Sequence, residues 1–234
     1  NYRELARNSI LASRVQANML MVRMNVKDYL KTISDKDIRE FNYYYDKTFG
    51  FIKEAQSQIK NSLRASMIKE VSDDLSIYKK SFYEVVEFMN IRNNIVNNNL
   101  DINGKRIEQL LTSISRGAKK DGDLKAVLVT NDGIRSLLLA RLYTAKYLAS
   151  NLISDASRVQ EEFSDLQKGL ISINKEVDNE VRQKNLQEAV GLITKYRNGV
   201  SSIVSLIEKR NNIISTRLNI LGPEIAKISE NVKL

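Results

Sequence analysis

The sequence of 234 residues contains no cysteine and no histidine. The absence of cysteine excludes disulfides, thiolate nucleophiles and thiolate metal sites. The absence of histidine also excludes the common forms of zinc and haem ligation and imidazole-based proton transfer. Carboxylates, lysines and tyrosines remain, but they form no paired-carboxylate or phosphate-loop pattern. We therefore expect no catalytic residue, no metal and no cofactor, and a protein that is not an enzyme.

Proline and glycine are scarce, with 1 and 9 residues respectively. Both residues interrupt helices, so their scarcity indicates long helices. The apolar residues from Ala12 to Ile33 recur at alternating steps of three and four, as do those from Leu75 to Met89. This spacing is typical of a heptad seam in a helical bundle. The sequence therefore predicts an all-α fold.

Long hydrophobic runs are also absent, since no apolar run approaches the roughly 18 residues that a membrane span needs. Residue 1 is Asn and no signal peptide is visible, so we expect a fragment of a longer protein. The net charge of +9 favours anionic partners. However, the basic residues are spread along the chain and interleaved with acidic ones, without a basic run that carries aromatics. We expect no nucleic-acid partner.

The chain repeats itself at an offset of 118 residues. Arg23 recurs as Arg141, and Tyr29 recurs as Tyr147. Further pairs at the same offset are Leu30 and Leu148, Tyr78 and Tyr196, Arg92 and Arg210, Gly104 and Gly222, and Ile107 and Ile225. The repeat predicts two copies of one helical unit.

Capping residues and loops divide the sequence into six predicted helices, four short and two long. We expect them at about residues 1–33, 37–65, 72–116, 123–152, 154–184 and 186–234. The simplest packing is two four-helix bundles, stacked end to end, that share the two long helices. This gives a single bimodular domain, with one module at about 1–94 plus 212–234 and the other at about 95–211.

The apolar pattern of each long helix shifts part-way along. In the last helix the regular step holds through Ile207, and after Ile214 the apolar set is displaced by one position. The third helix has the same irregularity between Arg92 and Leu100. Such a stutter predicts that the helix turns a different face to its neighbours.

With this layout, the chain resembles the helical bimodular sensor domain of bacterial chemotaxis receptors and sensor kinases. The likeness is carried by Val22-Arg23-Met24 with Tyr29-Leu30, by Ala140-Arg141-Leu142 with Tyr147-Leu148, by Arg210-Asn211-Asn212 and by Leu218-Asn219-Ile220-Leu221-Gly222-Pro223. The resemblance implies a periplasmic domain of an inner-membrane protein, anchored by two flanking spans. It also implies a homodimer that binds a small organic acid or a periplasmic binding protein.

The resemblance also implies a position for the ligand. The best-known members hold a dicarboxylate with two arginines one turn apart on the first helix. Arg23 matches the second of these, whereas Leu20 stands at the position of the first. The sequence therefore departs from the dicarboxylate pattern.

Arg23 and Arg141 are the first candidate ligand-binding residues. Each lies one place beyond the seam, where a guanidinium can hold a carboxylate by two parallel hydrogen bonds. The alternative is an arginine that reaches solvent or pairs with a glutamate. Arg217 is a second candidate, because it falls on the extended seam of the last helix and a buried arginine needs an anion. The alternative for Arg217 is that the stutter rotates it to the surface.

Lys27, Tyr44 and Tyr45 are candidates to complete the site of Arg23, and Tyr143 to complete that of Arg141. A tyrosine hydroxyl can donate to a carboxylate, although aromatics at helical spacing also form plain core. The repeat counterpart of Arg217 is Asn99, so we expect the module with Arg23 to bind the more acidic ligand. Arg92 and Arg210, with their asparagine neighbours, are expected to be structural.

The leading functional prediction is an extracytoplasmic chemoreceptor domain that binds a small carboxylate and signals through its terminal helices. One alternative is the sensor domain of a histidine kinase that binds a periplasmic partner protein, which an exposed apolar patch would favour. Another is a structural dimerising bundle, in which every inward arginine pairs with a protein carboxylate. A nucleic-acid binder would show affinity that falls steeply with salt.

Overall fold

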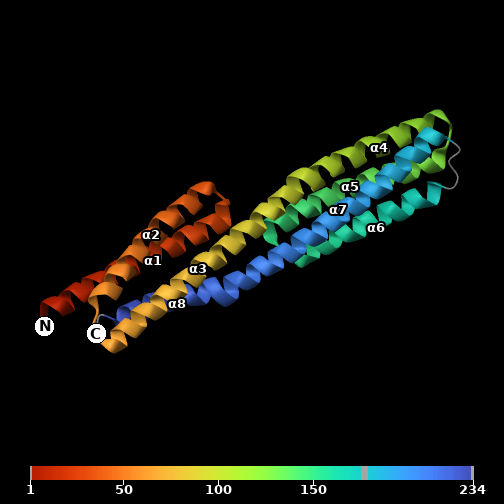
Figure 1. Ribbon diagram of the computed structural model, residues 1–234. Coiled ribbons are helices and arrows are strands. Elements are labelled where there is room, and N and C mark those ends of the chain that lie inside the picture. Colours follow the sequence, from red (N-terminus) through yellow and green to blue (C-terminus); the bar gives the residue numbers. More distant parts are fainter. Residues whose placement is uncertain (1, 175–178, 233–234) are drawn as a thin grey trace. The chain divides into compact units, whose positions relative to one another are not determined.

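The computed structural model describes residues 2–174 and 179–232, and these residues form six helices. Two of the helices are long, with 59 and 52 residues, which confirms the predicted all-α class with two long and four short helices. Each long helix is interrupted by one π-helical turn, labelled η. The elements are α1 (Tyr2–Thr32), α2 (Asp35–Gln58), α3 (Ser62–Ile95), η1 (Val96–Leu100), α4 (Asp101–Lys120), α5 (Leu124–Ser150), α6 (Ile153–Asn174), α7 (Glu180–Ile213), η2 (Ile214–Leu218) and α8 (Asn219–Asn231) (Figure 1).

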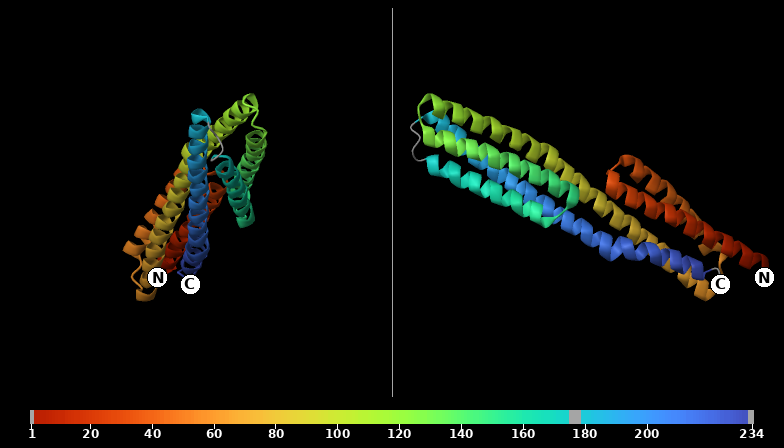
Figure 2. Two further views of the ribbon diagram at one scale, coloured as in Figure 1. Left: turned by 90° about the vertical axis from the view of Figure 1, so that its right-hand side faces the viewer. Right: turned by 180° about the vertical axis from the view of Figure 1, so that it is seen from behind.

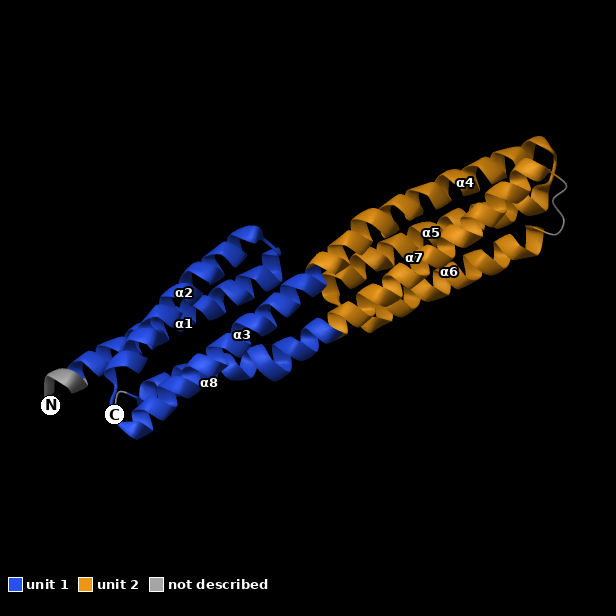
Figure 3. Cartoon of the chain, viewed as in Figure 1, with its two compact units in different colours: residues 1–89, 209–234 blue, residues 90–208 orange. Residues whose placement is uncertain are grey.

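The chain divides into two compact units (Figure 3). Unit 1 consists of residues 1–89 and 209–234, and unit 2 consists of residues 90–208. Each unit has a hydrophobic core of its own. In the part of the chain that the structure describes, no helix has a stretch that is long and apolar enough to cross a membrane.

In unit 1, α1 packs against both α2 and α8. Three aromatic rings pack together in the core. The centroid of the Phe82 ring lies 4.1 Å from that of Phe41 and 5.4 Å from that of Tyr29. Such aromatic pairs contribute beyond the area that they bury. The apolar residues of the predicted seams on α1 and α3 are accordingly buried here.

In unit 2, α5 lies beside both α4 and α6 (Figures 1 and 2). The approach of α5 to α6 depends on Gly133, since a Cβ atom at this position would lie only 2.6 Å from Leu166 Cδ1. Gly133 is buried within α5. The rings of Phe163 and Tyr196, 4.7 Å apart, join α6 to α7.

The turns after α1 and α5 are built alike, 118 residues apart. Ile33 and Asn151 adopt the left-handed conformation, with φ of 53° and 58°. Thr32 donates a hydrogen bond to the carboxylate of Asp37, as Ser150 does to Asp155 in the second copy. The repeat therefore extends to the backbone conformation and the side-chain hydrogen bonds of these turns.

Two predicted helix boundaries are wrong. The second helix was expected to continue to residue 65, but α2 ends at Gln58 and α3 begins at Ser62. Asn61 supplies the cap, because its side-chain oxygen accepts a hydrogen bond of 3.1 Å from the backbone N–H of Arg64. The expected start at residue 72 lies inside α3, where Val71 and Leu75 are fully buried.

The other wrong boundary concerns the last helix. It was expected to begin at about residue 186, but α7 begins at Glu180. The side-chain oxygen of Asn179 accepts hydrogen bonds of 3.1 Å from the backbone N–H groups of Val181 and Arg182. The fifth helix, expected to reach residue 184, is α6 and ends at Asn174; residues 175–178 lie outside the described part.

The two copies of the repeat exchange their last helices. The offset of 118 residues relates α1 to α5, α2 to α6 and α3 to α7, and it relates α4 to α8. Unit 1 contains α1, α2 and α3 of the first copy with α8 of the second, whereas unit 2 contains α5, α6 and α7 of the second copy with α4 of the first. Each unit is therefore assembled from both copies.

The π turns explain the two stutters. They occupy Val96–Leu100 and Ile214–Leu218, which are again 118 residues apart. A π turn accommodates one more residue than an α turn. The extra residue is absorbed there, so that Leu218, Ile225 and Val232 are buried in step with the apolar residues before the turn. The shift in each apolar pattern is therefore explained by a π turn. The predicted change of face between the two bundles stays a prediction.

Candidate anion-binding site

In unit 2, Arg141 on α5 lies over Gly104 of α4. A Cβ atom at Gly104 would lie 3.3 Å from Nε of Arg141 and 3.2 Å from Cε2 of Tyr196 on α7. Three helices therefore meet at one point, with a guanidinium stem and an aromatic ring against a bare helix backbone. Only glycine permits this approach without a shift of its neighbours.

Unit 1 holds the same group of residues. A Cβ atom at Gly222 of α8 would lie 3.0 Å from both Cδ and Nε of Arg23 on α1. Tyr78 on α3 is buried, and burial raises the pKa of its hydroxyl above the ordinary value, while the positive charge of Arg23 lowers it in part. Arg23 therefore lies close enough to Tyr78 for its charge to act on the hydroxyl.

The two groups are related by the repeat, which pairs Arg23 with Arg141, Tyr78 with Tyr196 and Gly104 with Gly222. We call each group an Arg–Tyr–Gly cluster. Within residues 2–174 and 179–232, neither clustered arginine makes a hydrogen bond or an ion pair. Each cluster therefore presents a guanidinium whose donors have no protein acceptor, and such donors match a carboxylate or another small anion.

Several other arginines that reach across to another helix or loop are paired within the protein. These are Arg106 with Glu188 at 2.7 Å, Arg182 with Asp123 at 2.9 Å, Arg197 with Gln160 at 2.9 Å and Arg217 with Glu84 at 3.3 Å. Arg23 and Arg141 differ from these, although they too pack against neighbouring helices.

A pocket of about 350 Å³ opens beside Arg141. Its lining comes from α5, η1, α7 and the first residue of α4, and comprises Val96, Leu100, Asp101, Leu138, Arg141, Leu142, Thr144, Ala145, Leu148 and Tyr196. Ligand sites are typically clefts of about 300–1,000 Å³ that combine apolar walls with a few polar groups. This pocket has both features.

The hydroxyls in this pocket are bonded to each other. Tyr196 donates a hydrogen bond of 3.3 Å to Thr144 Oγ1, and Thr144 donates one of 2.8 Å to the carbonyl oxygen of Ala140. The bond to Thr144 fixes the Tyr196 ring next to Gly104. The polar groups of the pocket that remain available to bind a ligand are therefore the charged side chains of Arg141 and Asp101.

The π turns position the glycines. Gly104 and Gly222 each lie one helical turn beyond the end of η1 and η2. Because η1 and η2 absorb an extra residue, they set the rotation of α4 and α8. If the same residues formed a regular α-helix without the π turn, each glycine would be rotated by about 100° about the helix axis, away from its arginine.

The other predicted residues of unit 1 lie in different surroundings. Lys27 is exposed on α1, one turn after Arg23. Tyr44 is half-buried on α2, with its ring 5.1 Å from that of Tyr43. Tyr45 is part of the core and stacks between Phe41 and Phe49. Lys27 is thus near the cluster along the helix, whereas the rings of Tyr44 and Tyr45 are engaged with other aromatics of α2.

Arg217 and Tyr143 are directed elsewhere. Arg217 lies in η2, and its side chain is 47% exposed with its guanidinium 3.3 Å from Glu84. Arg217 therefore lies at the surface, and the buried position considered for it is wrong. The ring of Tyr143 lies beneath the cations of Lys146 and Arg158, at 4.9 and 5.9 Å. Tyr143 therefore faces α6, and Tyr196 is the tyrosine in the pocket.

Arg92 and Arg210 bond to the asparagines that follow them. Arg92 Nη1 donates to Asn93 Oδ1 at 2.7 Å, and Arg210 Nη2 donates to Asn211 Oδ1 at 2.8 Å. Arg92 also reaches the carbonyl oxygen of Leu148 at 3.3 Å, which ties the start of unit 2 to the end of α5. These contacts fit the structural role predicted for both arginines.

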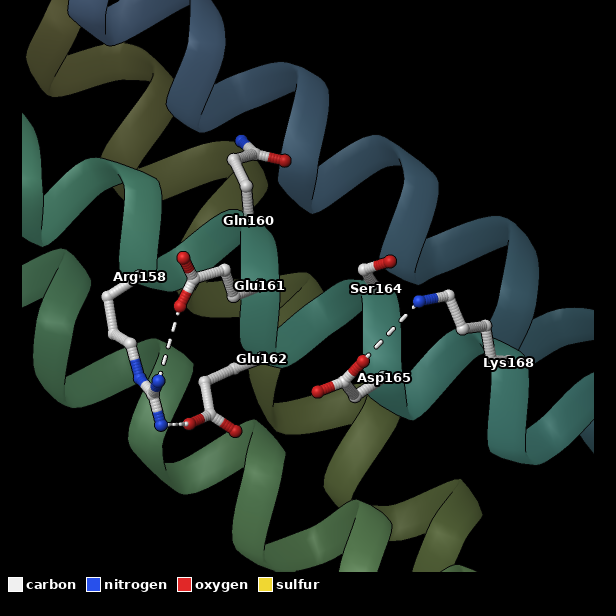
Figure 4. A pocket seen from close by; sticks show the side chains of 7 residues that line it. All are labelled: Arg158, Gln160, Glu161, Glu162, Ser164, Asp165 and Lys168. Carbon is white, nitrogen blue, oxygen red and sulfur yellow. Dashed lines mark hydrogen bonds and ion pairs between the residues drawn. The ribbon is translucent and has the colours of Figure 1, made fainter.

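A second hollow, of about 410 Å³, lies along α6 and is strongly polar (Figure 4). Its charges are paired within the helix. Arg158 bonds to Glu161 at 3.2 Å and to Glu162 at 2.6 Å, and Lys168 lies 3.6 Å from Asp165. This hollow therefore lacks an unpaired guanidinium like that of Arg141.

Sequence reasoning missed Tyr78, Tyr196 and Asp101 as site residues. Both tyrosines were assigned to the heptad seams, and the signal that could have identified them is their pairing in the repeat. Asp101 belongs to another helix than Arg141, and no spacing rule links the two positions. The chain matches no protein-family model, and no curated protein matches its sequence.

Proposed function

We propose that the chain is a sensor domain that binds small organic acids through Arg23 and Arg141, and that it is not an enzyme. The observation that supports this most directly is the repeated Arg–Tyr–Gly cluster with an unpaired guanidinium in each unit. An arginine held against a glycine and a buried tyrosine is pre-organised, so that little side-chain freedom is lost on binding. A carboxylate can then accept two parallel hydrogen bonds.

The cellular setting is proposed from the resemblance to helical bimodular sensor domains. In this proposal the chain is the periplasmic part of an inner-membrane chemoreceptor. The position of Arg23 supports a route for the signal, because Arg23 lies on α1 and packs on Gly222 of α8, the first and last described helices. An acid that binds Arg23 would favour one arrangement of α1 against α8 and shift the population toward it.

The proposal is tested by a thermal-shift screen of the 234-residue chain against mono-, di- and tricarboxylates, with nucleic acid as a control. A ligand that binds only the folded state raises Tm with its concentration. We expect a shift with at least one acid that is lost in Arg23→Ala or Arg141→Ala. The matched controls are Arg7→Ala on α1 and Arg135→Ala on α5, which remove exposed arginines outside both clusters. The absence of any shift with all carboxylates would overturn the proposal.

A second candidate function is association with another copy of the chain. Ile10, Leu20 and Met24 on α1 are 53%, 55% and 46% exposed. With Ala17 they lie at steps of seven, three and four, which fit one face of a heptad repeat. Their repeat counterparts on α5 are Leu128, Leu138 and Leu142, which are also exposed. We propose that α1 pairs with α1 of a second copy.

Sedimentation velocity checks this candidate. Leu20→Asp combined with Met24→Asp should convert a dimer into a monomer without loss of helical circular dichroism. Tyr43, an exposed aromatic on α2, provides the control substitution Tyr43→Asp. A wild-type chain that remains monomeric at high concentration, with and without acids, would remove the dimer from the proposal.

A further inference from the structure

Two opposite charges line the pocket of unit 2. Arg141 comes from the middle of α5, and Asp101 is the first residue of α4. In the described part of the chain, neither side chain forms an ion pair or a hydrogen bond, with the other or with any third residue. The pocket therefore offers a cation and an anion that are both available to a ligand.

Both charges act on the hydroxyl of Tyr196. Burial raises the pKa of Tyr196, the hydrogen bond to Thr144 and the charge of Arg141 lower it, and the charge of Asp101 raises it. Arg141, Asp101 and Tyr196 accordingly line the same pocket. A ligand that is seated at Tyr196 would lie within reach of both.

The rest of the lining is mostly aliphatic. Leu138, Leu142 and Leu148 come from α5, and Val96 and Leu100 come from η1. A volume of about 350 Å³ admits a small molecule with a short hydrocarbon part. The pocket thus has three distinct regions: a cationic one, an anionic one and an apolar one.

The corresponding positions of unit 1 carry different charges. Asn219 stands where unit 2 has Asp101, and Lys27 stands where unit 2 has Ala145. Unit 1 therefore combines its arginine with a second cation and lacks the carboxylate. The charge pattern of the unit 2 pocket is a property of that unit and not of the repeat.

We propose that the unit 2 pocket binds a small aliphatic α-amino acid as its zwitterion. The carboxylate pairs with Arg141, the ammonium group pairs with Asp101, and the hydrocarbon side chain lies against the leucines. The inference rests on the proposed acid-sensing function and narrows its ligand class for one unit. It also assigns the site of Arg23, with Lys27 nearby, to ligands that carry only negative charge.

Isothermal titration of the 234-residue chain with matched probes tests this assignment. The probes are L-alanine, L-valine and L-leucine, together with 4-methylpentanoate, which is leucine without its ammonium group, and 3-methylbutylamine, which is leucine without its carboxylate. We expect at least one amino acid to bind. If that amino acid is leucine, both analogues should bind at least about tenfold more weakly, which corresponds to about 1.4 kcal/mol for each lost charge contact.

Variants then attribute each charge contact. Asp101→Asn should weaken amino-acid binding at least tenfold and leave or improve the binding of 4-methylpentanoate, while Asp101→Glu should recover part of the loss. Arg141→Ala should weaken both ligands. Asp132→Asn, an exposed acid on α5 outside the pocket, is the matched control and should change neither. These substitutions are at exposed positions, so we expect the variants to fold.

The outcomes separate the two proposals. If 4-methylpentanoate binds as tightly as leucine, or Asp101→Asn leaves amino-acid affinity unchanged, the zwitterion assignment is wrong and acid sensing by Arg141 stands. If carboxylates bind but none of the amino acids does, the assignment is equally wrong. If no carboxylate and no amino acid binds, both proposals fail.

Discussion

Unit 1 and unit 2 contain the same framework but differ in the groups around it. Both hold an arginine against a glycine and a buried tyrosine, and both place a π turn before that glycine. Around this framework, unit 2 has Asp101 and Ala145 where unit 1 has Asn219 and Lys27. The comparison shows that the framework is the same in both copies while the charged residues around it differ.

A second difference lies where the π turns pack. In unit 2, Gly199 of α7 faces η1 so closely that a Cβ atom would lie 2.8 Å from Leu100 Cδ2 and 2.9 Å from Asn99 Nδ2. The repeat counterpart of Gly199 in unit 1 is Ser81, which is fully buried and whose hydroxyl has no hydrogen-bond partner in the described residues. The same position is thus tightly packed in one unit and carries an unpaired polar group in the other.

The largest effect is expected from exchanging these two residue types. Gly199→Ser should destabilise the protein by about 1–3 kcal/mol, because the new atoms enter a packed core and must displace the side chains of Leu100 and Asn99. Ser81→Ala should stabilise it by about 1 kcal/mol, because an unpaired buried hydroxyl is removed. Denaturant unfolding of both variants checks the prediction. If both substitutions change the free energy of unfolding by the same amount and in the same direction, positions 81 and 199 do not differ in packing as described.

An intermediate effect is expected at the glycines of the clusters. Gly104→Ala and Gly222→Ala should each raise helix stability by up to about 1 kcal/mol. Each should also weaken acid binding in its own unit, because the new Cβ displaces the arginine from its place. Thermal melts and titrations on the same samples measure both quantities. Gly191→Ala is the control, since a Cβ atom there would have no neighbour within 4 Å. A variant that melts higher and binds acids as before would contradict the role of the glycine.

The smallest effect concerns the loop between α4 and α5 in unit 2. The backbone N–H of Ala126 and the guanidinium of Arg182 lower the pKa of Asp123 below its ordinary value. A carboxyl whose pKa is lower in the folded state stabilises the fold above its unfolded pKa of about 3.9, and this contribution is lost as the pH falls through the folded pKa. Tm should therefore decrease below about pH 4 by a larger amount in the wild type than in Asp123→Asn.

This last prediction is checked by differential scanning calorimetry between about pH 3 and pH 6. Asp132→Asn serves as the control, since its carboxyl is exposed on the outside of α5. If Tm falls with pH in parallel for the wild type and the Asp123→Asn variant, the ionised carboxylate of Asp123 does not contribute to the stability of the fold. The repeat counterpart of Asp123 is Leu5, so the effect belongs to unit 2 alone.

Periodicity and the repeat were enough to predict six helices, two of them long, and to select Arg23 and Arg141 as candidates. They could not predict the helix end at Gln58, because Ser72-Asp73-Asp74 has the composition of a cap, and only burial of Val71 and Leu75 shows that it lies within a helix. The stutters were visible, but a shift in an apolar pattern does not distinguish a change of face from a π turn. Tyr78 and Tyr196 were visible only as seam residues, since the use of a hydroxyl depends on its three-dimensional neighbours.

The exchange of the last helices has a consequence for synthesis on the ribosome. Unit 2 is continuous in sequence and is complete once residue 208 has emerged, whereas unit 1 needs α8, which is made after unit 2. Since domains fold as units and the N-terminal parts emerge first, α1, α2 and α3 must wait with their apolar faces uncovered while a later part of the chain already folds. The helices α1, α2 and α3 are thus made before unit 2 but complete their own core only after it, and a chaperone that binds exposed apolar helices would find its substrate there.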